Sequence, residues 1–158
     1  MKSLFRAAAL AVVLTAALAE TNSRAADAGA PAAGSPIGLW KTFDDKTGAA
    51  RSLVRIYEQD GKLFGRIEQS FTQGADNRVC VECTDERKDK PIIGLIIIRN
   101  VRAADGEFSG GDILDPDNGS VYRCKFHLED SGSRLVVRGF IGLSILGRTQ
   151  NWQRQSNP

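Results

Sequence analysis

The sequence predicts an all-β protein, a small antiparallel barrel of about eight strands. From Gly38 onward, apolar and polar residues alternate along short stretches, which is the period of strands with one buried face. Each stretch ends at a cluster of Gly, Asp, Asn or Ser, the residues that favour turns. The last segment, residues 134–154, is an apolar strand, a Gly/Ser break and a second strand. We expect this hairpin to close the sheet into a barrel.

Three strands open the domain and are joined by tight turns. The first turn, residues 44–48, is a run of turn-forming residues, and the second, residues 59–62, contains the Asp-Gly hairpin signal. In the third strand, Leu63, Ile67 and Phe71 share the face that we expect to point inward. The three predicted strands are residues 38–43, 51–58 and 63–71.

A long connection then runs from Thr72 to Pro91. Connections of this length are unusual in compact domains and are often functional. Residues 92–98, which read IIGLIII, follow it and are too short and too β-branched to favour a helix. We therefore expect a buried strand here, which a short helical turn before Ile92 can precede.

The remaining strands have distinct faces. Residues 107–114 and 121–129 are joined by a turn at residues 115–119, and one face of the second strand carries Tyr122, Cys124, Phe126 and Leu128. In the closing hairpin, the apolar face of the first strand consists of Leu135, Val137, Ile141 and Leu143. One face of the last strand consists of Leu146, Arg148, Gln150, Trp152 and Arg154. If this face points inward, its polar groups need partners or water. The alternative is a solvated edge strand with one packed Trp.

The N-terminal residues have the pattern of a cleavable export signal. Lys2 and Arg6 form a basic region before an apolar run that ends at Ala19, and small residues offer cleavage after Ala19 or Ala25. The run is too short to cross a bilayer. Residues 20–35 are rich in Ala, Gly, Ser and Pro and read as a flexible linker. We therefore expect a periplasmic or secreted protein with one barrel domain, residues 36–154, and a short tail, residues 155–158.

The charge of the chain excludes one class of partner. The whole sequence has a net charge of +2, from 21 basic and 19 acidic residues. Cleavage after Ala19 removes Lys2 and Arg6 and leaves 19 of each, while cleavage after Ala25 leaves 18 of each. Because nucleic-acid-binding proteins carry a concentrated basic surface, we expect no nucleic acid as a partner. We also expect a monomer that is not a transmembrane protein.

Several motifs occur together in one exported bacterial family. They are residues 37–40 (IGLW), 80–83 (CVEC), 91–95 (PIIGL), 111–116 (GDILDP), 119–122 (GSVY) and 138–152, which ends in Gly-Arg-Thr-Gln-x-Trp. In this order they resemble the family called domain of unknown function 2147, over about residues 36–154. The resemblance implies a lipocalin-like β-barrel with an uncharacterised biochemical role. It supplies no catalytic residues.

Gly38 and Trp40 also resemble the Gly-x-Trp pattern of lipocalin-type barrels. In those barrels the Trp closes the floor beneath a basic residue from the last strand. An Arg head over an indole face gains about 0.5–2 kcal/mol. We expect Arg154 to be this partner of Trp40, with Arg148 as the second candidate. These residues are structural rather than functional.

Cys80 and Cys83, in the long connection, have three interpretations. A disulfide that staples the loop is favoured in an oxidising compartment. Zinc would need Cys124 and His127 as further ligands, but residues three apart on a strand point to opposite faces. A redox motif would need a helix N-terminus in a βαβ unit, which the chain does not show. We expect the disulfide, no metal, and a buried inert thiol at Cys124.

Two other groups have ordinary structural explanations. Asp112, Asp115 and Asp117 suggest a calcium loop, but residues 115–119 form a complete turn sequence and no glutamate follows at the twelfth position. His127, the single histidine, falls on a polar face, and no Ser-His-Asp or Cys-His arrangement can be assembled around it. We therefore expect no enzyme, no catalytic residues and no cofactor.

The function that we expect is the binding of one small, partly apolar molecule, hydrophobic or amphipathic, inside the barrel. Its walls would be Trp40, Tyr122, Phe126 and Trp152, and Arg148 with Gln150 would orient a polar end, since an inward Arg favours a carboxylate or phosphate. The alternative is a filled core in which Arg148 pairs with a carboxylate such as Glu68. In that case the loop from Thr72 to Pro91 would serve as a protein-interaction or inhibitor surface.

Overall fold

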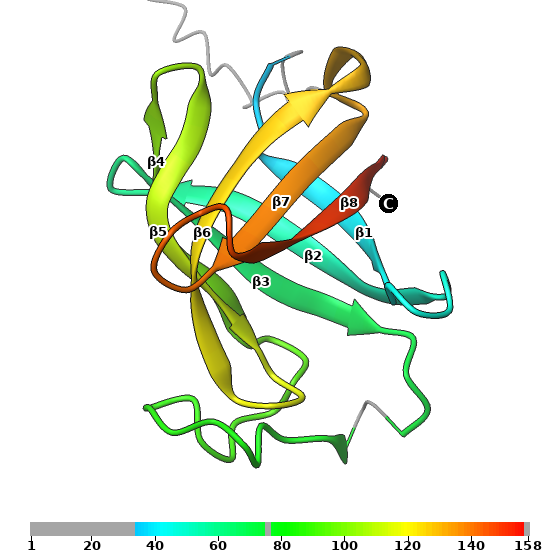
Figure 1. Ribbon diagram of the computed structural model, residues 1–158. Coiled ribbons are helices and arrows are strands. Elements are labelled where there is room, and N and C mark those ends of the chain that lie inside the picture. The colour runs from blue at the N-terminus through cyan, green and yellow to red at the C-terminus, as the bar shows by residue number, and fades with distance from the viewer. Residues whose placement is uncertain (1–33, 75–76, 157–158) are drawn as a thin grey trace, which may run out of the picture.

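Eight antiparallel strands pair in sequence order and close into a barrel in the computed structural model, which describes residues 34–74 and 77–156 (Figure 1). The strands are β1 (Gly38–Phe43), β2 (Ala50–Gln59), β3 (Lys62–Ser70), β4 (Ile96–Ala104), β5 (Glu107–Asp115), β6 (Ser120–Glu129), β7 (Arg134–Phe140) and β8 (Gly147–Gln155). A short 3-10 turn, η2 (Asp130–Gly132), joins β6 to β7. The predicted all-β barrel of about eight strands is confirmed.

The barrel closes where β1 pairs with β8. Leu39 lies opposite Gln155, Trp40 opposite Arg154 and Lys41 opposite Gln153. Gln155 therefore belongs to the last strand rather than to the tail. Closure pairs each of the eight described strands on both sides, and paired strand edges cannot pair with other chains.

Alternate side chains of each strand point into the barrel and form its core. In β2, Ser52, Val54 and Ile56 are buried while the residues between them are half-exposed. In β3 the same alternation buries Leu63 and Ile67. The period-two pattern of the sequence thus sets which side chains form the core.

One end of the barrel is plugged by Trp40 and Arg154. The Trp40 side chain is fully buried, and its Nε1 donates a 2.8 Å hydrogen bond to the Pro36 carbonyl. The Arg154 guanidinium lies over the indole with its carbon 4.3 Å from the ring centroid. It also donates hydrogen bonds to three backbone carbonyls, those of Ser35 (2.6 Å), Ile37 (3.0 Å) and Gly132 (2.6 Å). Partial burial lowers the pKa of Arg154, and the three carbonyls and the ring supply the partners that a half-buried guanidinium requires.

The long connection between β3 and β4 packs against the turn between β5 and β6. Cys80 and Cys83 form a disulfide and are both buried. A Cβ at Gly119 would lie 1.8 Å from the Glu82 carbonyl oxygen, so this contact leaves no room for a side chain. The Arg87 side chain is only 4% exposed and forms a 2.6 Å ion pair with Asp85. Arg87 also donates a 3.3 Å hydrogen bond to the carbonyl of Ile96 in β4, so packing and this buried guanidinium hold the loop to the barrel.

Several strand boundaries differ from the prediction. The strand expected at residues 92–98 begins at Ile96, because Gly94 has a φ of +90° and turns the chain before it. Residues 85–90, directly before this segment, form hydrogen-bonded turns. In the closing hairpin, β7 ends at Phe140 and Gly142 has a φ of +69°, so Ile141 and Leu143 lie in the loop and not on an inward face. Phe71 follows the end of β3 and is exposed.

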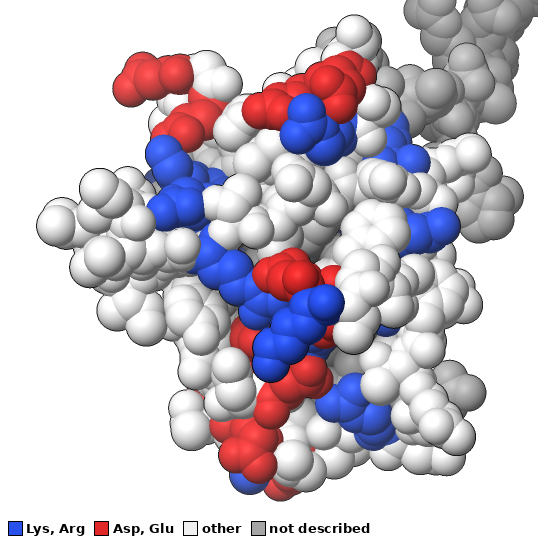
Figure 2. Space-filling model, turned by 45° about the vertical axis from the view of Figure 1, so that its right-hand side comes forward, with Lys and Arg blue, Asp and Glu red and all other residues white. Residues whose placement is uncertain are grey.

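The predicted signal peptide and most of the linker lie outside the described residues. Within the part of the chain that the structure describes, no helix is long and apolar enough to cross a membrane. Acidic and basic side chains lie in small mixed groups on the face shown in Figure 2.

Candidate ligand-binding cavity

A cavity of about 290 Å³ lies at the end of the barrel opposite the Trp40 plug. It is formed where β1, β5 and β7 end and where β2, β6 and β8 begin, so it opens among the loops of that end. Its lining consists of Thr42, Arg51, Ser52, Ile67, Ile97, Ile113, Leu114, Asp115, Pro116, Asn118, Tyr122, Val137, Gly139, Phe140, Ile141, Leu146, Gly147, Arg148, Gln150 and Trp152.

The deep part of the cavity is apolar. Ile67, Ile97, Val137 and Trp152 are buried residues from four different strands, and Tyr122 contributes an aromatic ring from a fifth. A polar exception is Thr42, whose hydroxyl shares a 2.8 Å hydrogen bond with the hydroxyl of Ser52. One hydroxyl donates to the other, which reduces the cost of placing them in an apolar wall.

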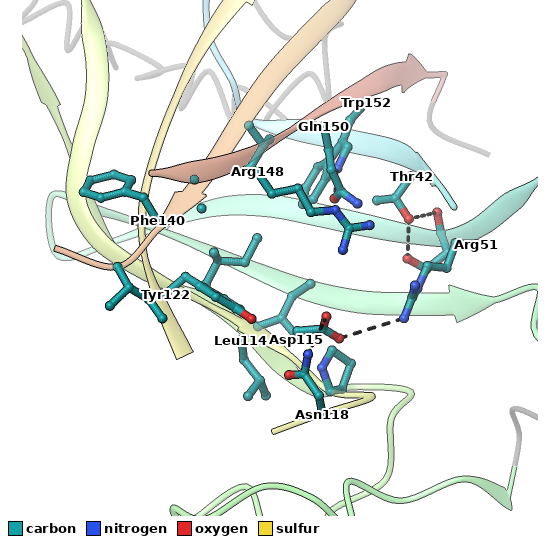
Figure 3. Close-up of a pocket in the computed structure, with 18 of the residues that line it drawn as sticks. Thr42, Arg51, Leu114, Asp115, Asn118, Tyr122, Phe140, Arg148, Gln150 and Trp152 are labelled. Atoms are coloured by element: carbon teal, nitrogen blue, oxygen red, sulfur yellow. Dashed lines mark hydrogen bonds and ion pairs between the residues drawn. The ribbon is translucent and has the colours of Figure 1, made fainter. Parts of the chain in front are cut away.

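A chain of polar groups from β8 leads from the apolar part to the mouth (Figure 3). The Trp152 Nε1 donates a 3.2 Å hydrogen bond to the side-chain oxygen of Gln150, whose amide nitrogen donates at 3.1 Å to Asp45. Arg148 donates to the other oxygen of the same carboxylate. The hydrogen bond with Asp45 raises the pKa of Arg148 further above its usual range. Asp45 is thus hydrogen-bonded to Arg148 and Gln150, the two β8 side chains that can bind an anionic group.

The opposite side of the mouth holds a second charged group. Arg51 pairs with Asp117 and lies 3.9 Å from Asp115, and Asp117 also accepts a 2.9 Å hydrogen bond from Arg78. Asp115 also accepts a hydrogen bond from the backbone nitrogen of Asp117, which forms the turn between β5 and β6. These carboxylates therefore bind backbone nitrogens of the turn and neighbouring arginines, as the turn interpretation of residues 115–119 predicts.

The structure separates the six predicted ligand-binding residues into two groups. Tyr122, Arg148, Gln150 and Trp152 line the cavity. Trp40 and Phe126 do not, because Trp40 belongs to the plug and Phe126 stacks on Phe108 in the packed core, with ring centroids 5.4 Å apart. This placement corrects the expectation that both would be cavity walls.

Sequence reasoning missed Asp45, the partner of Arg148. It proposed Glu68 as the alternative partner, but Glu68 pairs with Arg55 at 2.6 Å. Asp45 and Arg148 are 103 positions apart, so no local pattern connects them. Ile141 and Leu146, which line the mouth, were expected in strands and instead belong to the loop between β7 and β8.

The other predicted groups have structural roles. The Cys80–Cys83 disulfide is present, and Cys124 is a buried free thiol whose pKa burial raises to about 12, with a further contribution from Asp112. His127 is partly exposed and lies 3.0 Å from Glu129. Among the described residues, no group of three or more His, Cys, Asp or Glu side chains is placed to hold a metal ion.

An eight-strand antiparallel barrel that is plugged at one end and has a cavity at the other is a lipocalin-like protein. The chain belongs to the family described as "Uncharacterized protein conserved in bacteria (DUF2147)", whose model matches residues 38–154. This confirms the family that the motifs indicated.

A solved structure shares the fold. It is described as "Protein HP1028 from the human pathogen Helicobacter pylori belongs to the lipocalin family". The two chains are 16% identical, with a TM-score of 0.68, and the match covers 78% of this chain and 85% of that chain. At this identity the likeness shows the fold alone. A comparison with curated proteins found no match.

Proposed function

We propose that this protein binds one small amphipathic molecule with an acidic end in the cavity of the barrel. The observation that carries the proposal is the composition of that cavity, an apolar interior that ends at Arg148 and Gln150. Ligand sites in proteins are mostly apolar, with a few polar groups that fix orientation. A filled core would have opposed this function, and a cavity of about 290 Å³ supports it.

The position of Arg148 supports the choice of an acidic end. Its guanidinium and the Gln150 amide both donate to the Asp45 carboxylate, so the site already accommodates a carboxylate group at the mouth. A ligand carboxylate would take the place of Asp45, and the arginine would keep an anionic partner throughout. The apolar part of the ligand would lie against Tyr122 and Trp152. The protein would carry or buffer this molecule without converting it.

The proposal also includes the compartment. A protein exported by the predicted signal would keep the Cys80–Cys83 disulfide oxidised, since disulfides persist in oxidising compartments. Intact-mass measurement of the mature protein should show cleavage after Ala19 or Ala25. A mature protein that retains residues 1–19 would contradict export.

Ligand binding can be tested by competition with a fluorescent fatty acid. We expect an unlabelled medium-chain carboxylic acid to displace the probe better than the corresponding alcohol, because only the acid can pair with Arg148. Arg148→Met should remove this preference, at a cost of about tenfold or more in affinity for the acid. Arg102→Met, which changes an exposed arginine of β4 outside the cavity lining, is the matched control.

Two results would decide against the proposal. The first is a wild-type protein that binds neither probe nor acid and that carries no small molecule in native mass spectrometry after purification from the export compartment. The second is an Arg148→Met variant with an unchanged preference for the acid. The first result would leave the loop at residues 72–91 as the alternative functional surface.

One observation favours this loop as a protein-interaction surface. The side chain of Val81 is exposed although the disulfide and the Lys88–Val81 hydrogen bond hold this part of the loop. A fixed, exposed apolar side chain is suited to a partner protein. A complex that Val81→Asp abolishes and Arg148→Met leaves intact would support this function.

A further inference from the structure

The loop between β7 and β8 exposes four large apolar side chains at the mouth of the cavity. Ile141 is 68% exposed, Leu143 72%, Ile145 78% and Leu146 71%. They are four of the six residues between the two strands, and the other two are Gly142 and Ser144. In Figure 1 this loop projects from the barrel beside the label of β6. A cluster of exposed apolar side chains is typical of an interaction surface.

The loop is held in its exposed position by Arg138 of β7. The guanidinium donates hydrogen bonds to the carbonyls of Ser144 (2.6 Å) and Ile145 (3.0 Å) and to the Thr149 hydroxyl (2.6 Å). Within the loop, the Leu146 nitrogen also donates to the Leu143 carbonyl at 3.0 Å. These hydrogen bonds fix the backbone that presents the apolar side chains, of which Ile141 and Leu146 also border the mouth of the cavity.

Three arginines lie next to this loop, and two of them make no ion pair among the described residues. Arg138 lies at its base and makes no ion pair among the described residues, and neither does Arg123, which lies opposite Phe140 on β6. Arg148, the third arginine of this region, has the Asp45 carboxylate as its partner. The uncharged projection at the left edge of Figure 2 is where this loop extends, and basic side chains lie beside it.

We propose that the β7–β8 loop docks the protein on an anionic lipid surface, with its four apolar side chains inserted among the headgroups. Apolar side chains next to arginines match such a surface, in which hydrocarbon lies beneath negative charge. A second copy of the chain fits less well, because a symmetric pair would bring the same arginines of both copies together. The proposal does not depend on what the cavity binds.

The docked orientation would bring the cavity against the membrane. Ile141 and Leu146 line the mouth as well as the loop, so a loop among the headgroups would place the mouth at the same depth. The plugged end, with Trp40 and Arg154, would face away from the lipid. An amphipathic molecule could then pass between the lipid surface and the barrel without crossing open water.

Sedimentation with vesicles tests the docking directly. We expect the full mature protein to bind vesicles of phosphatidylethanolamine and phosphatidylglycerol and to bind phosphatidylcholine vesicles more weakly. Leu143→Ser and Ile145→Ser should each weaken binding about tenfold, because each removes one inserted side chain. Val79→Ser, which changes an exposed valine on the β3–β4 loop, is the matched control and should leave binding unchanged. Arg123→Gln should weaken binding about fivefold on the anionic vesicles only.

Three outcomes would overturn the proposal. The first is a wild-type protein that stays in the supernatant with both kinds of vesicle. The second is a pair of loop variants that bind vesicles as tightly as the wild type. The third is a stable dimer in analytical ultracentrifugation that Leu143→Ser dissociates. Leu143 and Ile145 are exposed to solvent, so we expect both serine variants to fold. Circular dichroism of the variants checks that unfolding is not the cause of a loss of binding. The fatty-acid competition for Arg148 should be unaffected by Ile145→Ser in the absence of vesicles, which separates this proposal from the binding function.

Discussion

Arg154 stacks on Trp40 across a directly opposed pair of β8 and β1, and this contact is the seam at which the barrel closes. The guanidinium joins three segments, since its hydrogen bonds reach Ser35 and Ile37 before β1 and Gly132 between β6 and β7. The contact therefore holds together parts of the chain that are 119 positions apart.

Substitutions at this seam should show strong coupling. Trp40→Ala should lower the free energy of unfolding by about 3–5 kcal/mol, because it truncates a fully buried aromatic side chain. Arg154→Ala should cost about 2–4 kcal/mol, since it removes a cation–π contact and charged hydrogen bonds to backbone carbonyls. Arg154→Lys should recover little of this, because one ammonium group cannot reach three carbonyls in different directions. Denaturant unfolding of the single and double variants gives the coupling, and strict additivity would contradict direct contact.

Gly119 should not tolerate a side chain, because the Glu82 carbonyl occupies the space that its Cβ would need. Gly48, which has a similar φ, has no such neighbour. Gly119 and Gly48 have φ values of +70° and +71°, so alanine at either site meets the same backbone strain, about 1–2 kcal/mol. Only at Gly119 would the new Cβ also collide with the Glu82 carbonyl, since the surroundings of Gly48 are open. We expect Gly119→Ala to cost more than twice as much as Gly48→Ala in thermal unfolding. Equal losses would show that the long loop moves away freely.

The three cysteines should differ in reactivity. Alkylation of the native, non-reduced protein at neutral pH should label none of them, because Cys80 and Cys83 are oxidised and the pKa of the buried Cys124 thiol is about 12. Unfolding without a reductant should expose one thiol, that of Cys124. Replacing both Cys80 and Cys83 by alanine should cost roughly 2 kcal/mol, which is small because the closed loop is short. Labelling of Cys80 in the non-reduced protein would contradict the disulfide.

Asp85 should make the stability of the fold depend on acid pH. The hydrogen bonds from Arg87 lower the pKa of the Asp85 carboxyl from 3.8 to about 2. Because the carboxyl is a stronger acid in the folded state, the pair stabilises the fold above pH 3.8, and this contribution is lost as the pH falls towards about 2. The difference in unfolding free energy between the wild type and Asp85→Asn should therefore be constant near neutral pH and shrink in this window. A difference that is independent of pH would contradict the shift.

The barrel could be predicted from the sequence because its strands keep one buried face and end at residues that form turns. Two glycines explain where the prediction was wrong. Gly94 and Gly142 adopt positive φ within apolar runs, and the alternation around them continues although the chain no longer forms a strand. An apolar residue in a loop, such as Leu143, has the same appearance in the sequence as one in a core.

The site could be predicted only in part, for a different reason. The face of β8 that carries Arg148, Gln150 and Trp152 follows from strand period alone. The partner of Arg148 does not, because Asp45 reaches it only after the barrel closes. The sequence also does not show how far along the barrel axis an inward aromatic residue lies. It therefore could not distinguish Trp40, which lies in the plug, from Trp152, which lies in the cavity wall.

The plug has a practical consequence for experiments on this protein. Ser35 and Arg154 are hydrogen-bonded, so the chain enters and leaves the barrel at the same place, on the side away from the cavity mouth. Tethering the mature protein to a sensor chip through an affinity tag at either of its termini would leave the mouth and the β7–β8 loop turned toward the flowing solution. A fluorescent protein joined there would likewise sit at the far pole of the barrel and leave vesicles and fatty acids unobstructed access.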